Sequence, residues 1–290
     1  MMMNTKQKLL WIIKTLVYVS AWIGLFYIIP WYGRFFMIMW FGGLFFQSAF
    51  FHRYAAHPDY SMSVIKEKVA YVGAFLFQGS SYLSAYAYAL MHRIHHAFTD
   101  TEKDPHSPNY DANGLDMMRR TAKIYNRIFK KGEYMGEAIP EKFKKNVPVW
   151  HSFDKLAHTW VVRLAWVAGY AIVYLVLALK VDHAARWEWW IIVPLMLITC
   201  ILGPFHGMIV NWYGHTFGYR NFATKDLSRN IGKWILSIPM NFIMMGEDLH
   251  NNHHAYQYSP NFAKKWWEYD FIYTLLWTLD RIRIIKLKMA

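Results

Sequence analysis

Histidines gather in three short stretches of this chain. Residues 92–96 read HRIHH, residues 250–254 read HNNHH, and residues 52–57 read HRYAAH. Imidazole is the commonest metal ligand in proteins, and neutral nitrogen ligands suit iron, copper, zinc or nickel. Eight histidines grouped so closely therefore indicate a metal site. Histidines that stand apart are expected to be ordinary hydrogen-bonded residues: His106, His151, His158, His183 and His206.

Helical geometry explains the spacing within two of these clusters. Residues i and i+4 share one face of an α-helix, so His92 stacks with His96, and His95 points about 100° away from His96. One turn can thus offer imidazoles to two neighbouring metals, and HNNHH repeats the arrangement with His250, His253 and His254. The i, i+5 spacing of His52 and His57 does not align on a straight helix. Pro58 disfavours helical geometry at His57, so we expect the helix to end there and fold His57 back.

The ligand types exclude several kinds of metal site. The single cysteine, Cys200, excludes internal disulfides, a four-cysteine zinc site and a cysteine-bound iron–sulfur cluster. A carboxylate-bridged di-iron bundle needs two Glu-x-x-His motifs, and EDLH, from Glu247 to His250, is the only one here. A zinc hydrolase needs three ligands, and a haem bundle would place histidines inside membrane spans. A two-metal, all-histidine site at a membrane surface is left.

The composition indicates a membrane protein with a large extramembrane part. The 290 residues are 55% hydrophobic and 19% aromatic, yet 18% are charged. Crossing a bilayer takes about 20 apolar residues in a helix. Four stretches qualify and form two hairpins with short loops: 9–30, 34–51, 160–180 and 187–210. The apolar stretch 69–90 contains Gln, Ser and Gly, so we interpret it as a cap or interface helix, with a fifth span as the alternative.

Lysine and arginine set the expected orientation. Fifteen of them lie in segment 52–158 and ten in 215–290, whereas the short loops carry few. By the positive-inside rule both large segments and both termini are cytoplasmic, and every histidine cluster then lies on one side. The sequence predicts one all-α integral membrane domain, 1–290, with a helical cytoplasmic cap (52–158 and 215–290). The net charge of +13 fits an anionic lipid surface better than nucleic acid.

The three histidine stretches together closely resemble the boxes of the membrane fatty acid desaturases, in particular the Δ9 acyl-CoA and acyl-lipid branch. That family has the boxes HxxxxH, HxxHH and HxxHH in this order. Two further elements match: HRIHHAFTDTEKDPHSP extends the second box, and NWYGHTFGYR resembles the Asn-x-x-x-His element before the third. Four spans in two hairpins with a cytoplasmic cap is also the family's architecture. The resemblance covers most of the chain.

The resemblance implies two irons (Fe²⁺) and O₂ as co-substrate. It assigns to one iron His52, His57, His92, His96 and His254. It assigns to the other His95, His215, His250 and His253, with Asn211 reaching that iron through a water. Because ligating imidazoles usually donate their other N–H, the candidate partners of these rings are Asp100, Asp104, Glu247 and Asn251 or Asn252.

The implied reaction places a double bond in an unactivated fatty acyl chain carried on CoA or lipid, so the chain must lie in an apolar tunnel. Tyr88 is a candidate for the tunnel wall, and Trp40 and Leu44 for its closed end. The electron donor is expected to be a separate protein, cytochrome b5 or ferredoxin with a reductase. The basic stretch 119–145 suits an acidic donor, a CoA phosphate or anionic lipid equally well. A bacterial inner membrane or the ER membrane would fit.

Some features depart from the family pattern and keep alternatives open. GEDLHNNHH replaces the usual Gly-Glu-Gly-aromatic lead into the third box, and Pro58 and Asp59 follow the first box in place of Arg-Ser. These changes bear on the substrate and not on the metal. A di-iron membrane hydroxylase of a lipid is the alternative enzyme, because the boxes do not distinguish the two reactions. A histidine-rich metal carrier or sensor is the alternative outside enzymes.

Overall fold

Helices make up most of the molecule, as the sequence predicted. The computed structural model describes residues 5–233 and 236–288. The helices are α1 (Thr5–Ile28), α2 (Trp31–Phe45), α3 (Val64–Gln78), α4 (Ala85–Phe98), α5 (Gly114–Lys131), α6 (Glu141–Lys144), α7 (His151–Ala157), α8 (Trp160–Val176), α9 (Trp189–Cys200), α10 (Leu202–Thr216), α11 (Ser237–Met244), α12 (His250–Ala255) and α13 (Phe271–Arg281). π-Helical segments extend α2 (Phe46–Ala56) and α8 (Leu177–Val181). Two antiparallel ribbons pair β1 (Tyr60–Ser61) with β4 (Lys286–Leu287) and β2 (Glu133–Tyr134) with β3 (Glu137–Ala138).

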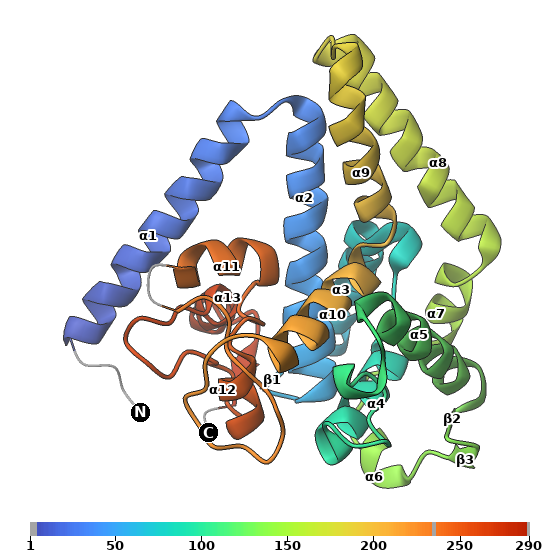
Figure 1. Cartoon of the computed structure of the whole chain (residues 1–290), viewed down its shortest axis with the longest axis vertical. Helices are drawn as coiled ribbons and strands as arrows, with labels where there is room; N and C mark the ends of the chain where they lie inside the picture. Colours follow the sequence, from blue (N-terminus) through green and yellow to red (C-terminus); the bar gives the residue numbers. More distant parts are fainter. Residues whose placement is uncertain (1–4, 234–235, 289–290) are drawn as a thin grey trace.

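Two helical hairpins project from a helical base (Figure 1). One consists of α1 and α2, the other of α8 and α9, and the remaining helices gather at their lower ends. The tips of the hairpins are joined by Asp182, whose carboxylate accepts hydrogen bonds from the backbone N–H groups of Trp31 and Tyr32 at 2.9 and 3.0 Å. This carboxylate caps the first turn of α2, where the preceding Pro30 offers no side-chain acceptor.

Three continuous helices are long and apolar enough to cross a membrane. They are Thr5–Ile28, Trp31–Ala56 and Trp160–Val181, and a bent pair, Arg186–Cys200 with Leu202–Thr216, could supply a fourth. Three of the expected spans thus have a helix at their place. At the expected fourth span over 187–210 the helix turns through 87°, so the span there is a bent pair and not one continuous helix.

Proline causes this break. Pro204 has no N–H to donate to the carbonyl of Cys200, four residues earlier. That carbonyl instead accepts a hydrogen bond from Ser80 Oγ at 2.8 Å, and the N–H of Gly203 donates to Ser81 Oγ at 3.2 Å. Backbone groups freed by a helix break inside a membrane protein need such partners. The break lets α10 turn toward the base of the molecule, which brings His215 to the other histidines.

The stretch 69–90 is not one helix. It divides into the end of α3, a 3₁₀ turn over Gly79–Ser81, and the start of α4, which contains the HRIHH box. Ser84 caps α4, since its side chain accepts from the N–H of Ala87. With 15 residues, α3 is shorter than a span, and the described residues contain no fifth candidate. The alternative of a fifth span therefore has no support.

Close helix packing depends on two glycines. A Cβ at Gly42 of α2 would lie 2.1 Å from the Phe77 ring of α3, and one at Gly73 of α3 would lie 2.2 Å from the Phe46 ring. Each glycine thus receives an aromatic ring from the opposite helix. Small residues allow this approach in membrane helices. The packing holds α3 in place. It thereby also positions the following 3₁₀ turn, whose Ser80 and Ser81 bind the backbone groups freed at the helix break.

We expect Gly42→Ala to destabilise the protein by about 1–3 kcal/mol, because the added methyl group would force Phe77 or the helices apart. Thermal unfolding in detergent measures the effect. Gly24→Ala in α1 is the matched control, since a Cβ there meets nothing within 4 Å. An unfolding temperature for Gly42→Ala equal to that of the control would show that α2 and α3 are not held this closely.

Candidate metal centre

Nine histidines from five separate places in the chain meet at the base of the hairpins. His52 lies in the π-helical extension of α2, His57 directly follows it, and His215 ends α10. The remaining six come from two helices: His92, His95 and His96 from α4, and His250, His253 and His254 from α12. Eight of the nine side chains are buried, and His96 is half-buried. The sequence named all nine residues.

The first cluster contains His52, His57, His92, His96 and His253, whose ligand nitrogens all lie within 4.8 Å of one another. Neighbouring Nε2 atoms are 2.8 Å apart for His57 and His92, 2.9 Å for His92 and His96, and 3.1 Å for His52 and His253. A metal bonded to imidazole at about 2.1 Å sets adjacent ligand nitrogens about 3 Å apart. The spacing matches such a site.

π-Helical geometry places His52 beside His57. In this segment each N–H bonds to the carbonyl five residues earlier, and the N–H of His57 donates to the carbonyl of His52 at 3.0 Å. Residues five apart therefore stand together, and the two rings lie 5.0 Å apart. The helix does end at His57, as predicted. The pairing comes from the wider helix, however, and not from a chain that folds back.

The second cluster contains His95, His215, His250 and His254. Nε2 atoms are 3.0 Å apart for His215 and His250 and 3.4 Å for His95 and His254. The expected partition between the two metals was therefore wrong for one pair, since His253 belongs to the first cluster and His254 to the second. The reason is helical: His250 and His254 are i and i+4 on α12, as His92 and His96 are on α4, so each pair serves one cluster.

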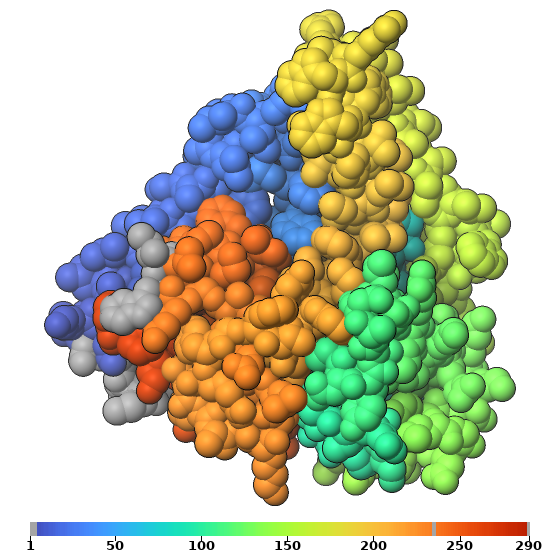
Figure 2. All heavy atoms as spheres, viewed as in Figure 1, coloured from blue at the N-terminus to red at the C-terminus, as the bar shows by residue number. Residues whose placement is uncertain are grey.

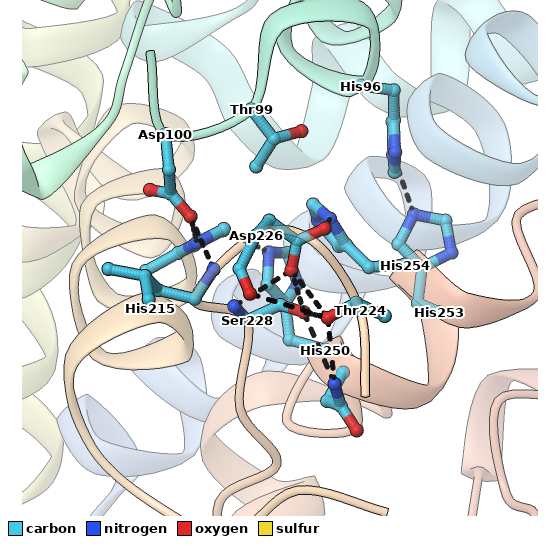
Figure 3. A network of polar contacts seen from close by, with 12 residues as sticks. His96, Thr99, Asp100, His215, Thr224, Asp226, Ser228, His250, His253 and His254 are labelled. Atoms are coloured by element: carbon cyan, nitrogen blue, oxygen red, sulfur yellow. Dashed lines mark hydrogen bonds and ion pairs between the residues drawn. The ribbon is translucent and has the colours of Figure 1, made fainter. Parts of the chain in front are cut away.

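Four carboxylates orient the rings. His52 Nδ1 lies 2.7 Å from Glu247, His95 Nδ1 2.9 Å from Asp104, and His215 Nδ1 3.0 Å from Asp100. These three acids are the partners that the sequence proposed. Asp226 is a fourth, 3.1 Å from His254 Nδ1 (Figure 3). It lies in an irregular loop with no motif, so no sequence pattern could have singled it out.

The hydrogen bonds of these rings indicate a cation between them. A neutral imidazole has one N–H, and His95 and His254 each direct Nδ1 at a carboxylate. Their Nε2 atoms then face each other with lone pairs, an arrangement that is repulsive unless a positive ion lies between. The four carboxylates also carry four negative charges, which would balance two divalent cations. The residues therefore fit a two-metal centre.

Arginines inside two of the histidine boxes hold the elements in place. Arg93 of HRIHH donates to the carbonyls of Ala56 and Ala55, at 2.7 and 3.0 Å, at the end of the π-helix. This contact sets α4 against His57. Arg53 of HRYAAH is fully buried and pairs with Asp270 at 3.0 Å, which ties the same π-helix to the start of α13. The sequence analysis assigned neither arginine a role.

The asparagines of the centre differ in their contacts. Asn251 accepts from the N–H groups of Asn221 and Phe222, each at 2.9 Å, and Asn252 donates to Glu268 at 2.8 Å. Both bind Asn221 in the loop after α10, and within the described residues neither makes a hydrogen bond to a ligand histidine, contrary to the expectation that one would orient a ligand. Asn211 stands one turn before His215 on α10 and faces a cavity. Its expected contact with a metal through water stays a prediction.

A largely apolar cavity of ≈ 550 Å³ opens beside both clusters. Ligand rings of His52, His92 and His250 form part of its wall, together with Leu83, Met91, Met117 and Tyr88. Tyr88, the predicted wall residue, stacks on His92, with the two ring centres 5.9 Å apart. Lys130, Lys155 and Arg163 line it toward the surface.

The predicted closed end of this cavity needs correction. Within the described residues, neither Trp40 nor Leu44 lines it. Trp40 lies behind His206, with ring centres 6.4 Å apart, and donates a hydrogen bond to the Phe242 carbonyl, while Leu44 is fully buried in the core. Because α10 is broken, its Gly203, His206 and Gly207 come between α2 and the cavity and form the wall there.

Figure 2 shows the outer covering of the site on one face. The orange surface of the loop after α10 lies beside the green surface of the chain after α4. These are the segments that carry Asp226 and Asp100, and Leu227 N–H donates to Asp100 at 2.7 Å. The same carboxylate thus orients His215 and fastens the loop that orients His254.

Comparison with known proteins agrees with this geometry. The family model "Fatty acid desaturase" matches residues 30–281. A hex-5-enoyl-[acyl-carrier protein] acetylenase of Moorena producens is 26% identical over 270 residues, covering 81% of this chain and 69% of the relative. A Delta-9 desaturase-like 4 protein of Arabidopsis thaliana is 29% identical over 231 residues, covering 78% and 66%. An acyl-CoA C20 Delta5-desaturase of Anemone leveillei is 30% identical over 233 residues, covering 79% and 64%. The chain thus spans about two thirds of the length of these relatives.

We expect Asp226→Ala to weaken metal binding by the second cluster about 10- to 100-fold, because the His254 ring would lose its orienting partner. Titration of chelator-stripped protein with metal measures the affinity. Asp116→Ala is the control, since the Asp116 carboxylate interacts with the exposed Arg119 and with Asn113 on the surface at the start of α5 and with none of the ligand histidines described. Equal affinities for Asp226→Ala and the unaltered protein would show that the carboxylate does not act through His254.

The metal-free protein is expected to lose stability as the pH falls below about 6.5, the ordinary histidine value. Burial, reinforced by neighbouring imidazoles, holds the pKa values of His92, His96, His250 and His253 well below it. The unfolded chain then binds protons that the folded protein excludes, which favours unfolding. His95 opposes the trend, because Asp104 raises its pKa in spite of burial. Thermal unfolding of chelated protein at pH 8 and pH 5.5 measures the shift, and a higher unfolding temperature at pH 5.5 would contradict it.

Proposed function

Since the chain belongs to the fatty acid desaturase family, we propose that it introduces a cis double bond, at the Δ9 position, into a saturated acyl chain carried on CoA or a lipid. The observation that carries the proposal is the cavity. Three ligand histidines share its wall with apolar side chains, so a hydrocarbon chain in it would pass the metal centre. The Δ9 position is supported by the names of relatives such as the Arabidopsis protein.

Two irons held by the clusters would use O₂, two protons and two external electrons to remove one hydrogen from each of two adjacent carbons, with two waters as the other product. The protein would position the acyl chain and the metal ligands and exclude water from the centre. Glu247, Asp104, Asp100 and Asp226 hold four of the rings in the tautomer that presents Nε2 to a metal. Tyr88, which stacks on His92, and Met91 line the cavity beside this ligand and would hold the chain there without water.

The cationic end of the cavity supports an anionic carrier. Lys130 and Lys155 are exposed where the cavity meets the surface, and Arg163 stands beside them. A phosphate of CoA or of a lipid head group would pair with such side chains. Lys130 belongs to the basic stretch 119–145. By contrast, Arg120 of that stretch binds Asp111 at 2.7 Å and the carbonyl of Asp104 at 2.8 Å, so it supports the metal-side loop.

Electrons would come from a separate protein, cytochrome b5 or a ferredoxin with its reductase. We place the protein in a bacterial inner membrane or the ER membrane, with the metal centre and both termini on the cytoplasmic side. The distribution of lysine and arginine supports this orientation. The expected architecture of a single domain over 1–290 belongs to the same proposal.

The test is expression with a donor system, followed by gas chromatography of the lipids. New cis-monounsaturated chains are the expected result. Hydroxy fatty acids would instead indicate the hydroxylase, and an unchanged lipid profile would reject both enzymes.

We expect His95→Ala to abolish desaturation while leaving the protein folded in the membrane, because the second cluster would lose the ligand that Asp104 orients. Lipid profiling measures activity, and gel filtration of detergent extracts measures folding. His183→Asn, in the exposed loop between α8 and α9, serves as the control. Desaturation by His95→Ala at the control's rate would reject the two-metal mechanism.

A further inference from the structure

His206 is a buried histidine that the metal centre does not use. It lies on α10, is only 1% exposed, and lines the cavity. In the described part of the chain neither of its ring nitrogens has a hydrogen-bond partner. The Met244 carbonyl faces the ring but could satisfy one nitrogen at most. The sequence predicted an ordinary hydrogen-bonded histidine here, whereas in the described residues at least one ring nitrogen of His206 has no partner.

The wall around His206 is polar and leaves room. Gln47 lines the same part of the cavity, and its amide donates to the Gly203 carbonyl at 3.2 Å and accepts from Gln78 at 3.1 Å. One N–H of Gln47 is left over, because a side-chain amide has two. A Cβ added at Gly207 would meet only the Gln47 nitrogen, at 3.8 Å. The missing side chain therefore leaves a recess beside these groups.

A plain hydrocarbon chain would leave this recess unsatisfied. Even if the Met244 carbonyl pairs with one ring nitrogen, the other nitrogen of His206 and one N–H of Gln47 would face the chain, and burying such groups without a partner weakens binding by about tenfold. A buried water makes about three hydrogen bonds, and His206 and Gln47 would supply two of them. A hydroxyl or keto oxygen on a carbon chain needs fewer partners, and its carbons suit the apolar wall formed by Met208 and Val210.

We propose that His206 and Gln47 form a hydrogen-bonding subsite that recognises an oxygen-bearing group, a hydroxyl or keto group, on the acyl chain. The inference rests on the proposed function, because it takes the cavity to hold an acyl chain. It adds a preference for a substituted chain, which the family match does not imply. His206 lies on the broken helix and Gln47 on the π-helical segment after α2, and neither belongs to a histidine cluster.

The test compares acyl substrates of one length, unsubstituted or with a single hydroxyl at successive positions, offered to the full-length protein with its donor system. The unaltered protein should convert at least one hydroxy isomer with a kcat/KM about tenfold above that of the unsubstituted chain. His206→Leu should reduce this ratio to about one, and His206→Gln, which keeps a donor and an acceptor, should preserve it. His151→Leu, at an exposed position on α7, should leave the ratio unchanged.

A second variant guards against misfolding of His206→Leu. Gly207→Ala fills the recess without a close contact and should also lower the ratio. Equal turnover of all isomers by the unaltered protein would mean that only water occupies the recess and would overturn the proposal, as would a preference that survives in His206→Leu.

Binding separates this proposal from the proposed function. Metal-free protein should bind the preferred hydroxy acyl chain about tenfold more tightly than the plain chain, measured by the shift in thermal unfolding. Binding with this preference but no desaturation by the loaded protein would reject the function and keep the subsite. Desaturation of plain chains without any binding preference would support the proposed function and reject the subsite.

Discussion

The structure depends on bringing nine imidazole nitrogens together in a buried place. Lone pairs that face one another at about 3 Å repel, and burial lowers the pKa values of six of the rings (His57, His92, His96, His250, His253 and His254), so metal cations would stabilise the arrangement. The carboxylates of Glu247, Asp104, Asp100 and Asp226 fix the tautomers and supply the opposing charge. The centre therefore acts as one electrostatic unit. Bound metals, imidazoles and carboxylates would each offset the free-energy cost of burying the others.

Several irregular features of the backbone serve this unit. The π-helix after α2 sets His52 beside His57, and the break at Pro204 directs α10, with His215, to the same place. Both irregularities cost backbone hydrogen bonds or strain, and both are compensated by named partners, Arg93 for the end of the π-helix and Ser80 with Ser81 for the break. Irregular helices at a functional centre are common for this reason.

The break in the fourth helix also shapes the cavity. After the break, α10 passes Trp40 and presents Gly203, His206 and Gly207 to the cavity. The same proline thus decides where a metal ligand stands and what an acyl chain would meet. The chemistry of the centre and the selection of the chain are coupled through one backbone feature.

The sequence by itself determined the chemistry of the site. Ligand type and i, i+4 spacing are local properties, so eight histidines and the apolar helices could be read from short motifs, while the resemblance to the family added His215 and pointed to three of the four carboxylates. Helical spacing keeps His250 with His254, but only tertiary structure decided which cluster this pair and His253 join, since that depends on how α12 is set against α4. It also decided the role of Asp226, the bend at Pro204 and the cavity wall. These depend on contacts between residues far apart in the chain, which no local spacing records.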